Sequence, residues 1–185
     1  MSERIALTNL TKRFGPLTAV DGIDMSVKGG EVLGFLGPNG AGKSTTMKMI
    51  TGFLTPTSGT AHVDGIDVVS NPVEAKKQIG YLPEGAPCYG DMTPEAFLGF
   101  IADIRQLSGP SRKSAIDIAI ERVDISGVLD QPIETLSKGF KRRVGLAQAI
   151  LHDPPILILD EPTDGLDPNQ KHQVRTLIQE MASDK

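Results

Sequence analysis

The sequence predicts an α/β fold: a mainly parallel sheet covered by helices, with an N-terminal antiparallel β part and an inserted α-helical subdomain. Three observations point to it. Short β-prone runs alternate with amphipathic helical segments along most of the chain. A glycine-rich loop separates one apolar run from the helical segment that follows it. A block of helical segments that begins near Thr93 then interrupts the alternation.

Each predicted strand is a short β-prone or apolar run bounded by turn residues. The run EVLGFL, residues 31–36, is compact and apolar, which fits a buried strand. The Asp64–Gly65 pair between β-prone flanks predicts a hairpin turn. In chain order, the predicted strands are residues 4–14, 22–27, 31–36, the hairpin 56–68, 77–84 and 156–160.

Each predicted helix carries apolar residues at helical spacing. Thr93 is expected to cap one of these helices, with Pro94 at its first position. The predicted helices are residues 43–54, 93–107, 111–123, 138–153 and 168–181. These elements divide the chain into a first core part at residues 1–92, the helical subdomain at residues 93–135, and a second core part at residues 136–185.

Composition limits the class of protein. The 185 residues are 39% hydrophobic and carry a formal net charge of −4, which suits one soluble domain with a buried core. The acidic pI, near 5.4, argues against a surface that binds nucleic acid. No apolar run approaches the ~18 residues of a membrane span, and the first residues show no secretory leader, so a cytoplasmic protein is expected. The single cysteine, Cys88, can form neither an internal disulfide nor a thiolate metal cluster.

Residues 37–44 spell G-x-x-x-x-G-K-S between a predicted strand and a predicted helix, which is the setting of a phosphate-binding loop. Glycines let the backbone approach phosphate oxygens closely. Lys43 is expected to contact the β- and γ-phosphates, and the Ser44 hydroxyl to bind Mg²⁺. The alternative is an ordinary glycine-rich turn. The expected nucleotide-binding residues, which give the fold class of a P-loop NTPase, are Gly37, Pro38, Asn39, Gly40, Ala41, Gly42, Lys43, Ser44 and Thr45.

A second motif is the apolar run ILIL, which ends in two adjacent carboxylates, Asp160 and Glu161. Such a strand end lies on the same edge of a parallel sheet as the phosphate loop. Asp160 is expected to hold Mg²⁺, and Glu161 to polarise the attacking water as general base. The alternative is a solvated strand end before a turn.

The stretch LSKGFKRR, residues 136–143, taken alone reads as a capped helix start. Together with ILILDEP and the DGLD stretch at residues 164–167, it resembles the signature of the ATP-binding cassette (ABC) ATPases. The resemblance covers essentially the whole chain and identifies a nucleotide-binding subunit of an ABC transporter. The run from residue 135 to residue 170 is similar to the exporter-type branch that includes the gliding-motility ABC ATPases.

This resemblance implies roles for further residues. Phe14 takes the place of the aromatic ring that stacks on adenine, with Val20 on the same side; a core phenylalanine is the alternative. Ser137 and Gly139 are expected to reach the γ-phosphate of an ATP held by a second copy, and Asp167 to cross the same dimer interface. Lys138 and Phe140 stand where the signature more commonly has glycine and glutamine, and these two departures are interpreted as marks of a subfamily.

The resemblance also shows two departures. Glu84 stands where most family members carry the glutamine of the loop that senses nucleotide. Glutamate can still approach Mg²⁺ through an oxygen, but it adds a negative charge beside Asp160 and Glu161, so its contact with the metal is left open. The family places a switch histidine one strand beyond the DGLD helix, and the sequence stops at Lys185 before that strand. His172, inside the predicted helix, does not correspond to it. The chain is therefore expected to be C-terminally truncated and to bind Mg-ATP more readily than it hydrolyses it.

Function follows from the family: an ATPase subunit that powers a transporter, an exporter by this resemblance, through ATP-driven dimer closure. Its expected cofactors are ATP and Mg²⁺. Its expected partners are a second nucleotide-binding subunit and a separately encoded transmembrane permease, at the cytoplasmic face of the membrane, with no nucleic acid. The alternatives are a soluble ABC ATPase that acts on nucleic acid or ribosomes, and a non-enzymatic nucleotide switch, against which Glu161 argues. The transported substrate does not follow from the sequence.

Overall fold

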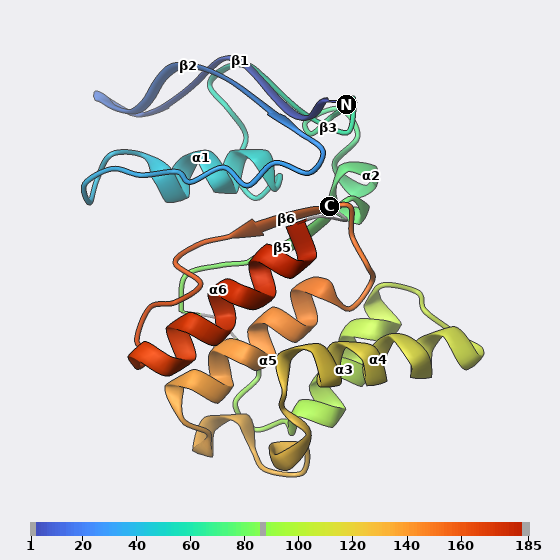
Figure 1. Ribbon diagram of the computed structural model, residues 1–185. Helices are drawn as coiled ribbons and strands as arrows, with labels where there is room; N and C mark the ends of the chain where they lie inside the picture. The colour runs from blue at the N-terminus through green and yellow to red at the C-terminus, as the bar shows by residue number, and fades with distance from the viewer. Residues whose placement is uncertain (1–2, 86–87, 183–185) are drawn as a thin grey trace. The chain divides into compact units, whose positions relative to one another are not determined.

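The computed structural model describes residues 3–85 and 88–182 (Figure 1). The chain forms two compact units, the first made of Met1–Ile79 with Ala182–Lys185 and the second of Gly80–Met181. In the described part of the chain, no helix is both long and apolar enough to span a bilayer.

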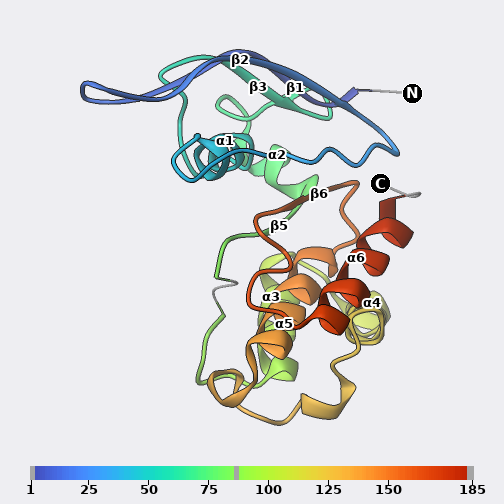
Figure 2. The ribbon, with the colours of Figure 1, turned by 60° about the vertical axis from the view of Figure 1, so that its left-hand side comes forward.

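An antiparallel sheet dominates the first unit. Its four strands are β1 (Glu3–Phe14), β2 (Leu17–Lys28), β3 (Ser58–Val63) and β4 (Ile66–Asp67), in the spatial order β2-β1-β3-β4. Helices α1 (Lys43–Ile50) and α2 (Pro72–Lys77) lie on the same side of this sheet (Figures 1 and 2). The predicted N-terminal antiparallel part is therefore present.

Local sequence explains two details of this sheet. Ile5 and Leu7 alternate toward the core, and a register shift after Leu7 lets Leu10 face the core as well. The β3–β4 turn is formed by Asp64 at φ 51° and Gly65 at φ 76°, which is the primed hairpin geometry that an Asp-Gly pair favours. The hairpin prediction is confirmed.

The predicted buried strand at residues 31–36 is wrong. The structure shows an irregular segment there, between β2 and α1 (Figure 1), and Leu36 is 93% exposed. A strand requires a neighbour that completes its hydrogen bonds, and no strand among the described residues pairs with this segment. An apolar run indicates that a segment tends to be buried, but it does not provide the neighbouring strand with which that segment would pair.

The second unit consists of a two-stranded sheet and a helical layer. Strands β5 (Ile79–Leu82) and β6 (Ile156–Leu159) pair with each other. The helices are α3 (Pro94–Ile104), α4 (Gly109–Val123), α5 (Lys138–Ile150) and α6 (Pro168–Ala182), with short 3₁₀ turns at Ser126–Val128 and Ile133–Thr135. Every predicted helix is thus present.

Helix α5 is the centre of this unit. It packs against α3 and α4 (Figure 2), and Val144 and Leu146 lie in one buried cluster with Leu98 of α3 and Ala119 of α4. Full burial of a leucine side chain contributes roughly 1.5–3 kcal/mol. The predicted cap of α3 is confirmed, because the Thr93 hydroxyl accepts from the Ala96 amide at 3.2 Å. The boundaries at residues 93 and 135 stay a prediction.

Candidate functional site

The phosphate loop has the backbone conformation that its glycines allow. Gly40 and Gly42 have φ values of 83° and 84°, in the left-handed region, and Gly42 caps the N-terminus of α1. A Cβ on Gly42 would lie 2.4 Å from the carbonyl oxygen of Ala19 and 3.1 Å from Cγ2 of Val20. Strand β2 therefore packs so closely against the loop that only glycine fits at position 42.

The loop presents unpaired backbone donors. In residues 3–85 and 88–182, the amides of Gly40, Gly42, Lys43 and Ser44 donate to no protein acceptor. The Lys43 ammonium folds back and donates to the carbonyl oxygens of Gly37, at 2.7 Å, and Pro38, at 2.9 Å. Free N–H groups at a helix N-terminus, beside a lysine, form a binding site for an anion such as a phosphate group.

Phe14 is the last residue of β1 and is 47% exposed, so it is not a core phenylalanine. The Lys12 ammonium lies 5.2 Å from the centre of this ring. Val20 is buried against Gly42. Both views of the unit place the β1–β2 turn on the same side as the phosphate loop (Figures 1 and 2).

A pair of glycine substitutions separates close packing from backbone strain. Alanine at position 40 or 42 incurs the left-handed cost of about 1 kcal/mol. Gly42→Ala also forces contact with Ala19, whereas a Cβ on Gly40 meets nothing within 4 Å. We expect Gly42→Ala to lose at least about 1 kcal/mol more than Gly40→Ala in urea unfolding. Equal losses would show that β2 does not pack on the loop.

Asp160 continues the β5–β6 pairing, since its amide donates to the carbonyl oxygen of Leu82 at 2.8 Å. The residue is 3% exposed, and its Oδ2 is buried without a hydrogen-bond donor in the described part of the chain. A buried carboxylate oxygen without a partner is costly. A cation, or a water molecule bound to one, is the kind of group that would satisfy it.

The acidic residues Asp160 and Glu84 fit Mg²⁺ better than they fit a metal ion that protein side chains alone would bind. No group of three or more His, Cys, Asp or Glu side chains that could hold a metal occurs among the described residues. Mg²⁺ needs only one or two protein oxygens when phosphates and waters supply the rest. Glu84 is exposed. Burial raises the pKa of Tyr81, and the negative charges of Asp160 and Glu84 raise it further, so both carboxylates act on one local environment.

The residues expected at the dimer interface lie at the starts of two helices in the second unit. Ser137 caps α5 and accepts from the Phe140 amide at 3.3 Å. Gly139 is buried, and a Cβ there would lie 2.6 Å from Oε1 of Gln170. Asp167 accepts from the amide of Gln170 at 2.9 Å. Gln170, which sequence analysis did not identify, therefore brings the Gly139 and Asp167 turns together.

Arg142 is the second residue that sequence analysis missed. It is buried in α5, and its guanidinium donates to the carbonyl oxygens of Pro83, Asp160 and Glu161. Burial lowers the pKa of Arg142, and nearby carboxylates, that of Asp164 first, act in the opposite direction. The arginine pair within LSKGFKRR was the available signal, but the sequence does not show which of the two points inward.

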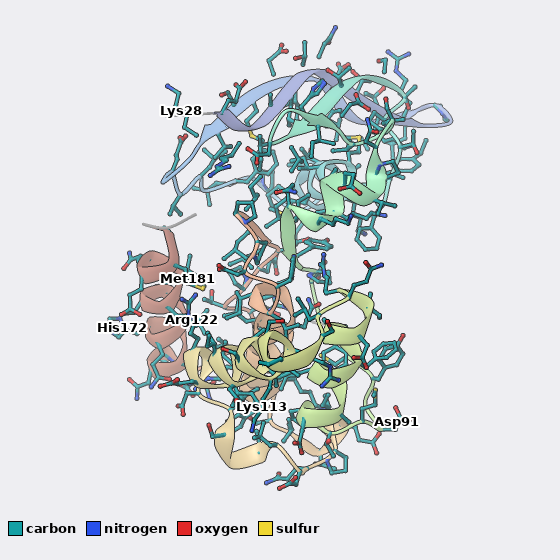
Figure 3. All side chains as sticks on the ribbon, turned by 90° about the vertical axis from the view of Figure 1, so that its right-hand side faces the viewer. Lys28, Asp91, Lys113, Arg122, His172 and Met181 are labelled. Carbon is teal, nitrogen blue, oxygen red and sulfur yellow. The ribbon has the colours of Figure 1, made fainter. Side chains whose placement is uncertain are left out.

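Two other side chains carry no site. His172 is exposed on α6 (Figure 3), inside a helix as expected. Burial raises the pKa of the Cys88 thiol to about 11, so this cysteine is protonated at neutral pH and is a poor nucleophile. The loop that carries Glu84 includes residues 86 and 87, which lie outside the described residues.

Comparison with known proteins decides the family. The sequence model of the ABC transporter family matches residues 20–164. The chain belongs to the ABC transporter family. Its fold class is confirmed by a solved ABC structure, cbiO1 from Clostridium perfringens, part of the ABC transporter complex cbiONQ. The two share 30% identity and a TM-score of 0.86, over 98% of this chain and 74% of that one.

Two curated relatives place this ABC chain near exporter-type ATPases. It is 42% identical over 89% of its length to the probable multidrug ABC transporter ATP-binding protein YbhF of Escherichia coli, of which it covers 28%. It is 40% identical over 100% of its length to the bacitracin transport ATP-binding protein BcrA of Bacillus licheniformis, of which it covers 60%. The chain thus spans less than two thirds of either relative.

Proposed function

We propose that this chain binds Mg-ATP and hydrolyses it, as the ATP-binding subunit of an exporter-type ABC transporter. The observation that carries the proposal is the phosphate loop, whose unpaired amides and folded-back Lys43 form an anion site at the start of α1. An ordinary glycine-rich turn has no need for a position such as 42, where an added Cβ would lie 2.4 Å from the carbonyl oxygen of Ala19 in β2. Membership of the ABC family supports ATP as the anion.

In this proposal, ATP is held by residues of the first unit. The loop amides and the Lys43 ammonium bind the β- and γ-phosphates. The exposed Phe14 ring stacks on adenine, and Val20 packs against Gly42 of the loop. The ATP-binding residues are Phe14, Val20 and the loop Gly37, Pro38, Asn39, Gly40, Ala41, Gly42, Lys43, Ser44 and Thr45.

In this proposal, hydrolysis depends on carboxylates of the second unit. Ser44 and Asp160 would hold Mg²⁺, and Glu84 is a further candidate ligand. When bound, Mg²⁺ neutralises charge on the phosphate oxygens. Glu161, which is exposed at the end of β6, accepts a proton from the attacking water.

The remaining proposals concern partners. A second copy of the subunit binds across Ser137, Gly139 and Asp167, so that ATP closes the dimer and hydrolysis opens it. A separately encoded permease joins this dimer at the cytoplasmic face of the membrane. The signature run supports the branch that includes the gliding-motility ABC ATPases, and the helical subdomain corresponds to residues 93–135.

A lysine substitution tests ATP binding directly. We expect Lys43→Ala to weaken the binding of Mg-ATP at least about tenfold, because a charged donor to the phosphates is lost. Titration calorimetry with Mg-ATP measures this. Lys48→Ala is the matched control, since Lys48 is exposed on the same helix and outside the loop, and it should bind as the unchanged protein does. Loss of binding in neither variant, or no binding by the unchanged protein, would refute the proposal.

A further inference from the structure

Arg142 joins the ends of both strands of the β5–β6 sheet to helix α5. Its Nη1 donates to the carbonyl oxygen of Pro83, directly after β5, at 3.2 Å. Its Nη2 donates to the carbonyl oxygens of Asp160, at 2.5 Å, and of Glu161, directly after β6. A guanidinium presents five donors in a rigid planar fork, so one side chain can hold several acceptors from two separate segments.

All three acceptors are backbone carbonyl oxygens, so the guanidinium does not use the neighbouring carboxylates as hydrogen-bond acceptors. Among the described residues, no carboxylate forms an ion pair with Arg142. The charges of Asp164, Asp160 and Glu161 nevertheless act on the guanidinium and compensate part of the cost of burying it. Hydrogen bonds from a charged donor are about twice as strong as neutral ones. Arg142 thus holds the main chain firmly without occupying the acidic side chains.

The hydrogen bond from Arg142 stabilises an unfavourable backbone conformation at Glu161. Its φ of 49° lies in the left-handed region, which costs a residue other than glycine about 1 kcal/mol. Its carbonyl oxygen accepts from Arg142 and also from the amide of Asp164 at 3.1 Å. Without the guanidinium, one of the two bonds that fix this unfavourable turn is absent, and the Glu161 carboxylate loses a defined position.

A hydrogen bond from a second side chain also connects helix α5 to the same sheet. Gln148 donates from Nε2 to the carbonyl oxygen of Tyr81 in β5 at 2.7 Å. The helix begins at Lys138, directly after its cap Ser137, and lies beside β5 and β6 (Figure 2). One rigid element therefore connects the Ser137 cap to the chain segments that carry Asp160 and Glu161.

We propose that Arg142 is a positioning residue, which fixes the backbone of Asp160 and Glu161 and so holds the Glu161 carboxylate in place for hydrolysis. Because it sits on α5, it also couples that carboxylate to the Ser137 end of the helix. The catalytic part of this inference rests on the proposed ATPase function; the backbone part does not.

The test uses Arg142→Met and Arg142→Lys. Methionine keeps much of the buried volume and removes every donor, so kcat should fall at least about tenfold, because small misplacement of a reacting group is costly. The Kd for Mg-ATP should change much less than kcat, since Arg142 is not among the proposed ATP-binding residues and Asp160 is the one proposed Mg²⁺ ligand whose backbone it holds. Lysine retains a charged donor and should restore part of kcat. Arg112→Met is the control: Arg112 donates to Asp103 and to the carbonyl oxygen of Gly99, away from both strand ends.

Hydrogen exchange gives a readout that does not require turnover. Arg142→Met should speed amide exchange in residues 82–85 and 159–166, while Arg112→Met leaves these segments unchanged. If the unchanged protein hydrolyses no ATP, the proposed function fails, and the exchange result still decides the backbone role. Unaltered exchange in Arg142→Met, or a fall in kcat accompanied by equal weakening of ATP binding and faster exchange throughout the unit, overturns the inference.

Discussion

Glu161→Gln is expected to bind Mg-ATP with unchanged affinity and to lose about 10³-fold of its ATP turnover, because an amide does not accept the proton of the attacking water. Glutamine has nearly the same shape as glutamate, and the contacts of Glu161 that the structure records run through its backbone. The substitution therefore removes the base and leaves the turn in place. With phosphate contacts intact and hydrolysis blocked, ATP should hold the variant as a dimer.

Phosphate release measures the turnover, and size-exclusion chromatography with ATP measures the dimer. Glu121→Gln is the matched control, because Glu121 is exposed on α4 and outside every proposed site. It should hydrolyse ATP as the unchanged protein does. A Glu161→Gln variant that keeps full turnover would remove Glu161 from the chemistry, and one that stays monomeric with ATP would contradict dimer closure.

The parts of the fold that could be predicted are those with local signals. An Asp-Gly pair specifies its own turn, and the β3–β4 hairpin forms at Asp64 and Gly65 as expected. Thr93 followed by a proline specifies a helix start, and α3 begins there. In both cases the residues that carry the signal are also the residues that make the bonds.

The errors in the predicted elements arise where structure depends on distant chain segments or on very few residues. Residues 31–36 are apolar enough for a strand, but a strand also depends on a neighbour, and a window of sequence cannot show one. Helix α2 (Pro72–Lys77) was missed because six residues are too few to show helical periodicity. Asn71 before Pro72 was the available signal for its start.

The candidate site divides in the same way. The loop glycines, Lys43 and the two carboxylates could be proposed as site residues from the sequence, because each belongs to a contiguous motif with known chemistry. Arg142 and Gln170 could not, since their partners lie tens of residues away and only the folded chain brings them together. Gly139 illustrates the difference: the family resemblance implied a contact with the γ-phosphate of a second copy's ATP, and the structure shows that the absence of a side chain at this position makes room for Gln170.

Gly80→Ala is expected to be the most destabilising of the proposed substitutions. A Cβ on Gly80 would lie 2.1 Å from the carbonyl oxygen of Ala149, 2.7 Å from Cδ2 of Leu157 and 2.8 Å from Cγ of Pro154. Atoms of helix α5 and strand β6 thus surround this position of β5. A backbone atom cannot move aside as the end of a flexible side chain can. We expect a loss of about 3 kcal/mol of unfolding free energy.

Alanine also lowers the entropy of the unfolded chain, which favours folding by about 0.4–1 kcal/mol and offsets only part of this loss. Gly127→Ala isolates that smaller contribution, because a Cβ on Gly127 meets nothing within 4 Å. Thermal unfolding should therefore show a fall of roughly 10 °C for Gly80→Ala and no fall for Gly127→Ala. If both variants unfold at the same temperature, the close approach of α5 and β6 to Gly80 is wrong, and with it the packing that holds α5 against the strand ends bearing Asp160 and Glu161.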